Sequence, residues 1–131
     1  MGERRQLTVI GPDGERSVEA IIAVEPPWSL SLDFGAGSIV EAEAADLFAA
    51  LEAIRTQLEP MGVRVCCAGA RSDVFPSGMA RQMAGGRRAY RLRPDQRPTR
   101  DDLVDIFDPA EPDEVVTVQE QIDAVERLRG R

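Results

Sequence analysis

The sequence predicts an α+β fold: a mainly antiparallel sheet, built as an N-terminal four-strand meander, with helices packed on one face. Four short segments of strand character come first, joined by turns rich in Gly and Pro. A strong helix pattern follows at residues 46–62, and shorter strand and helix patterns fill the second half. Strands that precede helices in this way are typical of α+β domains. At 131 residues, the chain is expected to be a single domain.

The meander is predicted from alternation and turn chemistry. Its strands are expected at residues 6–10, 17–25, 28–34 and 38–44. Between the first two, the sequence Gly-Pro-Asp-Gly at residues 11–14 is typical of a hairpin, because Pro presets φ and Gly accepts a positive φ. The third strand alternates most clearly, with Leu30 and Leu32 on one face and Ser29 and Ser31 on the other. One face of the sheet is therefore expected to be dry and the other wet.

The helix at residues 46–62 is expected to cross the dry face. Asp46 is a good N-cap, and Pro60 with Gly62 ends the helix. Its apolar residues have helical spacing: Leu47, Leu51, Ile54 and Leu58. Residues 63–70 come next and are apolar enough to predict an interior strand.

The second half contains three further helix patterns and one strand pattern. They are a short helix that starts at Ser77, a strand at residues 87–93, a helix that starts at Thr99 and a last helix at residues 117–131. Gly85 and Gly86 are expected to end the first of these with a positive φ. Thr117 and Glu120 form a capping box for the last one.

The composition excludes several chemistries. The chain has no His, which removes His-activated nucleophiles, His proton shuttles and His-ligated zinc. Its two cysteines, Cys66 and Cys67, are adjacent, too few for a thiolate metal site, and predict reduced, buried thiols. The acids at residues 101–105 indicate a solvated helix face rather than a Mg²⁺ site. We therefore expect no metal, no cofactor and no catalytic residue.

Charge alternates in three blocks along the chain. Residues 1–63 have four Arg and eleven acids, residues 64–100 have nine Arg and two acids, and residues 101–131 have three Arg and ten acids. The basic block is expected to pair with its acidic flanks inside the fold. That pairing and the overall net charge of −7 predict no nucleic-acid binding.

The sequence also predicts a cytoplasmic protein without a membrane partner. Its apolar runs are too short to cross a bilayer, and its N-terminal residues lack the apolar core of a signal peptide.

Residues 77–88 carry the main candidate for a ligand site. A helix that starts at Ser77 and Gly78 would offer free N–H groups to an anion, and Arg81, Arg87 and Arg88 stand near in sequence. The segment matches neither the P-loop nor the dinucleotide-binding pattern. A capped helical turn that connects two parts of the fold is the favoured interpretation, and an anion site is the alternative.

Two other candidates are weaker. Trp28 is expected to anchor the core, or, where exposed, to be the hot spot of a partner surface. Asp73, Ser77, Arg81 and Tyr90 include the residue types of an acid–base site, but nothing in their spacing requires one.

Residues 67–121, which include the stretch DVFPSGMARQMAGGRRAY, resemble a family of short uncharacterised bacterial proteins. The resemblance covers under half of the chain. It implies no activity, cofactor or site residue, because none is established for that family. It implies only that this segment is a recurring unit.

The sequence therefore favours a small acidic cytoplasmic module that recognises a protein partner, in the manner of an inhibitor or immunity protein. Its acidic flanks would attract a basic partner. One alternative is a domain that senses an anion or nucleotide through residues 77–88. The other is an enzyme that works without histidine.

Overall fold

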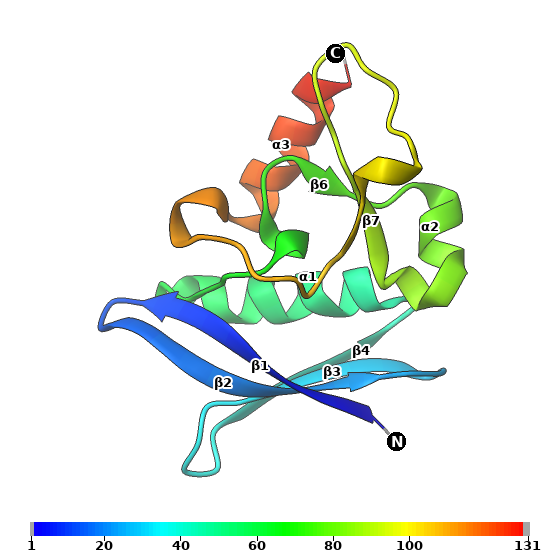
Figure 1. Ribbon diagram of the computed structural model, residues 1–131. Helices are drawn as coiled ribbons and strands as arrows, with labels where there is room; N and C mark the ends of the chain where they lie inside the picture. The colour runs from blue at the N-terminus through cyan, green and yellow to red at the C-terminus, as the bar shows by residue number, and fades with distance from the viewer. Residues whose placement is uncertain (1, 130–131) are drawn as a thin grey trace.

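Two antiparallel sheets and three α-helices make up residues 2–129, the part of the chain described by a computed structural model (Figure 1). The larger sheet comes from the N-terminal half, and the smaller one from the C-terminal half. Helix α1 (Leu47–Leu58) lies between them. The α+β class predicted from the sequence is confirmed.

The larger sheet begins with the predicted four-strand meander. Its strands are β1 (Gly2–Gly11), β2 (Gly14–Ala23), β3 (Trp28–Asp33) and β4 (Ile39–Ala44). A short fifth strand, β5 (Arg64–Val65), pairs with the free side of β1, which gives the order β4-β3-β2-β1-β5. The turn between β1 and β2 has Gly14 at φ +103°, so the predicted role of this glycine is confirmed.

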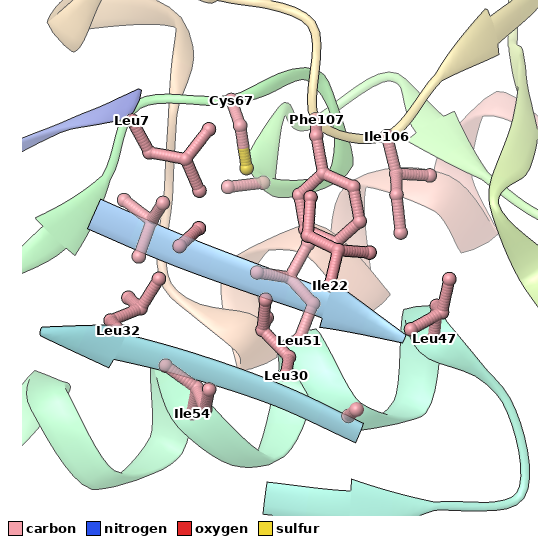
Figure 2. Close-up of a cluster of buried hydrophobic side chains, with 14 of the residues drawn as sticks. Leu7, Ile22, Leu30, Leu32, Leu47, Leu51, Ile54, Cys67, Ile106 and Phe107 are labelled. Atoms are coloured by element: carbon pink, nitrogen blue, oxygen red, sulfur yellow. The ribbon is translucent and has the colours of Figure 1, made fainter. Parts of the chain in front are cut away.

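One face of this sheet forms the main core. Figure 2 shows Ile22, Leu30 and Leu32 of the strands together with Leu51 and Ile54 of α1. Asp46 caps α1 as predicted, because its side chain accepts a hydrogen bond from the Ala49 N–H at 2.8 Å. Ile106 and Phe107, from the C-terminal half, are fully buried in the same cluster. The core therefore joins the two halves of the chain.

The opposite face of the sheet is open, with no helix of residues 2–129 lying over it (Figure 1). Ser29 pairs with Glu43, Ser31 with Glu41, and Glu19 with Asp33, so these six side chains share that face. The predicted alternation in β3 is confirmed, since Leu30 and Leu32 are buried and Ser29 and Ser31 are only half-buried. The open face is acidic.

The C-terminal half forms a second layer beyond α1. Its sheet has the order β6-β7-β8, and its elements are β6 (Val74–Phe75), α2 (Gly78–Gln82), β7 (Arg88–Arg91), β8 (Leu103–Asp105) and α3 (Val118–Leu128). Thr117 and Glu120 make the predicted capping box of α3. All three helices therefore lie on the same side of the larger sheet.

A buried arginine and a buried glutamine connect these layers. Arg55 of α1 is 3% exposed, and it donates to Gln121 Oε1 at 2.7 Å and to the Val116 carbonyl at 2.9 Å. Gln121 of α3 is fully buried, and its amide donates to the carbonyls of Gly69, Arg71 and Val74 at 2.8–2.9 Å. Together, the two side chains hold α1, α3 and the chain leading into β6.

The predicted interior strand at residues 63–70 is wrong beyond Val65. After β5, the chain leaves the sheet and forms a 3₁₀ turn at Ala68–Ala70. The reason is the close packing at Gly69, where an added Cβ would lie 2.6 Å from a methyl of Leu51. The Gly69 N–H donates to the Ile106 carbonyl instead of continuing the ladder with β1.

The predicted helix at Thr99 is also wrong. Thr99 and Asp102 make a capping box, but only the 3₁₀ turn Arg100–Asp102 follows it. The next residues form β8, in which Val104 pairs with Ala89 of β7. Pairing with an available sheet edge therefore overrides the local helix signal.

Both cysteines are free and buried, as the sequence predicts. Neither belongs to a strand, because β5 ends at Val65. Burial raises the pKa of the Cys67 thiol to about 12. This thiol is protonated at neutral pH and acts as a small apolar side chain.

Within residues 2–129, none of the helices combines the length and the apolar character that crossing a membrane requires.

We expect Gln121→Leu to lower the free energy of unfolding by about 3 kcal/mol, because it leaves the buried Arg55 cation and three carbonyls short of partners. Urea denaturation measures the loss. Gln119→Leu on the exposed side of the same helix is the control and should change stability little. A Gln121→Leu variant as stable as the control would contradict the structural role of this side chain.

Candidate functional site

The helix N-terminus proposed from the sequence as an anion site is capped by its own side chain. Ser77 Oγ accepts a hydrogen bond from the Ala80 N–H at 3.0 Å. Gly78 is exposed, with open space around its Cα. The helix that follows is very short and contributes little dipole. This geometry favours the connecting role of the segment over anion binding.

Arg81 is held within the fold. It donates to both carboxylate oxygens of Asp46, at 3.2 and 3.3 Å. Its guanidinium carbon also lies 5.2 Å from the ring centre of Phe48 and 5.5 Å from that of Phe75. Since Asp46 caps α1, the ion pair fastens α2 to the start of the long helix.

Arg87 also forms ion pairs within the fold, whereas the next residue, Arg88, forms none within residues 2–129. Arg87 donates to Asp105 at 2.9 Å and, through both terminal nitrogens, to the Glu3 carboxylate at 3.0 and 3.3 Å. Its guanidinium lies over the Phe107 ring. Arg88 is exposed at the start of β7. The structure therefore uses Arg81 and Arg87 as internal fasteners and directs only Arg88 to solvent.

Trp28 is half-buried and packs against the turn that follows α2. Gly85 has φ +64°, and a Cβ added to it would lie 2.4 Å from the indole ring of Trp28. The predicted positive φ at Gly85 and Gly86 is confirmed. The indole therefore has the anchoring role that the sequence favours, and it joins β3 to the second layer.

The arginines of residues 64–100 fall into two groups. Those with an ion pair to an acid are Arg71, Arg81, Arg87, Arg91 and Arg93. Those without such a pair to an acid in residues 2–129 are Arg64, Arg88, Arg97 and Arg100. Arg64 donates instead to the Val115 carbonyl at 3.4 Å. Arg91 pairs only with Asp73, which belongs to the basic block itself. The expected pairing with the acidic flanks is therefore present for the other four arginines of the first group.

Asp73, which the sequence suggests as a base, is the centre of an ion-pair cluster. Arg71 grips both of its oxygens, at 2.8 and 3.0 Å, and Arg91 donates to it at 3.2 Å. Burial opposes ionisation of Asp73, but the hydrogen bonds from these arginines outweigh it and lower the pKa of the carboxyl. A carboxylate held in this way is a poor proton acceptor at neutral pH.

The most prominent apolar exposure lies beside this region, on α2 and the residues after it. Met79 is 72% exposed and Met83 is 61% exposed. Both line a hollow of about 410 Å³, whose other apolar walls include Ala80, Pro98 and Leu103. Exposed methionines beside a hollow mark binding surfaces, because their flexible thioether chains adapt to a partner.

A second hollow of about 490 Å³ adjoins the first along Met79, Tyr90 and Pro98. Leu128 and Arg129, at the C-terminal end of α3, form its far wall. We call the two hollows together the methionine groove. It runs between α2, the irregular residues 92–99 and the end of α3, on the second layer of the fold.

Sequence reasoning found part of this groove. It singled out Ser77 and Arg88, which line the groove, but as parts of an anion site, and it gave Met79 and Met83 no binding role. Arg97 and Pro98 lie between the strand predicted at residues 87–93 and the helix predicted to start at Thr99, a stretch for which the sequence predicts only a connection. The signal that was available is the pair of methionines in a segment with few other apolar residues to cover them.

Comparison with known proteins gives no relative: no family model matches the chain, and no curated protein matches it either. The resemblance over residues 67–121 therefore stays a prediction.

We expect Gly85→Ala to lower the free energy of unfolding by about 3 kcal/mol, because the new methyl meets the Trp28 ring and the positive φ strains an L-residue. Thermal unfolding followed by Trp fluorescence measures it, since the chain has one Trp. Gly78→Ala, where the space is open, is the matched control. Equal melting temperatures for the two variants would refute the close contact.

Acid should weaken the Arg71 cluster. The pKa of Asp73 is lowered in the folded state, so its stabilising contribution is complete above the ordinary Asp pKa and is lost as the pH falls through the folded value. Arg71→Gln should therefore melt below the wild type at neutral pH and approach it as the pH falls from about 4, the ordinary Asp pKa, through the lowered folded value. Arg4→Gln, in an exposed pair with Glu19, is the control. A constant gap across this pH range for Arg71→Gln would argue against the cluster.

Proposed function

We propose that this chain is a small cytoplasmic binding module that recognises a protein partner, as inhibitor and immunity proteins do. The observation that carries the proposal is the exposure of Met79 and Met83 beside an apolar hollow. Side chains of this kind are costly to leave in water, and burial against a partner removes that cost. The free, buried thiols Cys66 and Cys67 support a reducing compartment.

The geometry supports the two alternatives less well. An anion sensor at residues 77–88 would need Ser77, Arg81 and Arg87 free for a ligand, and all three are engaged within the fold. An enzyme would need a set of groups with matched pKa values around a cavity. The methionine groove has one carboxylate in its lining, Asp95, and the Ser77 hydroxyl of the same hollow already serves as the cap of α2.

The proposal is tested by a double variant, Met79→Glu with Met83→Glu. Proteins that co-purify with the wild type from its native host are identified, purified and mixed again with the wild type and with the variant. A partner that binds the wild type should lose about tenfold or more in affinity for the variant, because two charges replace the apolar contact.

Met61→Glu is the matched control. Met61 is 56% exposed and lines a separate hollow with Phe34 and Val40. The control should bind the partner as the wild type does, and both variants should retain the wild-type melting temperature. A partner whose affinity is lowered by Met61→Glu and unchanged by the double variant would overturn the assignment of the groove.

A further inference from the structure

We propose that the methionine groove binds an acidic segment of the partner protein, which inserts an apolar side chain between the two hollows and places carboxylates on the surrounding arginines. This inference rests on the proposed function and adds to it the chemistry of the partner. It differs from the basic partner that the sequence favours, and the reason is the distribution of charge in the folded molecule.

The groove is a basic region of an acidic protein. Five arginines line its two hollows: Arg88, Arg93, Arg97, Arg100 and Arg129. One acid, Asp95, lines them as well. Of the five arginines, Arg93 has an ion pair with Asp102. The charge of this surface is thus opposite in sign to the net charge of −7 of the whole chain, and an acidic segment is its electrostatic complement.

The arginines of the groove without an ion pair to an acid in residues 2–129 are distributed over both hollows. Arg88 comes from β7, and Arg100 from the 3₁₀ turn before β8. Arg97 lies on the wall of the second hollow. Carboxylates on either side of one apolar residue would therefore meet guanidinium groups, which bind them through two parallel hydrogen bonds. The apolar residue itself would lie against Met79 and Leu103.

A protein segment fits this surface better than a nucleic acid does. Single-stranded nucleic acids bind through several aromatic side chains that stack on bases, and the groove contains one aromatic ring at its centre, Tyr90, with Phe75 at one wall. The open face of the larger sheet, with Glu19, Glu41 and Glu43, repels a long polyanion. A short acidic peptide extends over the groove alone and avoids that repulsion.

The experiment uses three short fluorescent peptides and measures binding by anisotropy. The first peptide consists of glutamates with a leucine at every fourth position, the second has lysines in place of the glutamates, and the third has serines in place of the leucines. We expect the first peptide to bind the wild-type protein about tenfold or more tightly than either of the others, and to bind more weakly as salt is added.

Charge reversal makes the test specific to the groove. The triple variant Arg88→Glu, Arg97→Glu, Arg100→Glu should lose about tenfold or more in affinity for the glutamate peptide and gain affinity for the lysine peptide. A gain of this kind cannot come from unfolding. The control triple variant Arg4→Glu, Arg16→Glu, Arg127→Glu has the same net charge and alters exposed arginines outside the groove, so it should keep the wild-type preference.

Three results would overturn the inference. They are equal binding of the glutamate and lysine peptides to the wild type, equal effects of the two triple variants, and tighter binding of a single-stranded oligonucleotide than of the glutamate peptide at the same salt. The purified partner separates this inference from the proposed function. A partner that is lost with Met79→Glu and Met83→Glu but kept by the groove triple variant leaves the protein-binding proposal standing and refutes the acidic segment.

Discussion

The arrangement of the two layers depends on Arg55, a buried arginine whose hydrogen-bond partners in residues 2–129 include no carboxylate. Burial lowers the pKa of the Arg55 guanidinium. Its hydrogen bonds are accepted by the Gly69 and Val116 carbonyls and by the Gln121 amide oxygen rather than by an acid. An arginine in such a place is stable only while every acceptor is in position. Because those acceptors come from three separate segments, α1 fixes the second layer through this one side chain. The methionine groove lies on that second layer, and Gln121 bonds Val74, the residue before groove-lining Phe75, so the shape of the groove depends on this buried contact.

Local signals in the sequence predict the first layer well, and long-range contacts explain what they miss. The hairpin at Gly14, the alternation of β3 and the Asp46 cap are each encoded within a few residues, and each is confirmed. The 3₁₀ turn at Gly69 depends on the Leu51 side chain, and β8 depends on the free edge of β7. Neither of these contacts leaves a pattern in its own stretch of sequence.

The candidate site likewise combines features that the local sequence predicts with features that only long-range contacts determine. The list of arginines at residues 77–100 was available from the sequence, but which of them remain free was not. Arg87 and Arg88 are neighbours in the chain, yet Arg87 is directed to Glu3 and Asp105 while Arg88 faces solvent, because Arg87 ends the turn before β7 with helical backbone angles and Arg88 begins the strand. Only the fold separates arginines that fasten layers from arginines that are open to a partner.

The acidic open face of the larger sheet and the basic groove lie on different sides of the molecule, and this separation has a consequence for association. The open face lies on one side of α1, and the basic groove lies on the second layer, on the other side (Figure 1). Separated charges of opposite sign give the molecule a dipole moment. An acidic partner that diffuses toward it would experience a torque as well as an attraction to the groove, and the pair would rotate before contact so that the groove faces the partner. The acidic face of the sheet would thus raise the fraction of collisions that occur in a productive orientation, although it does not contact the partner itself.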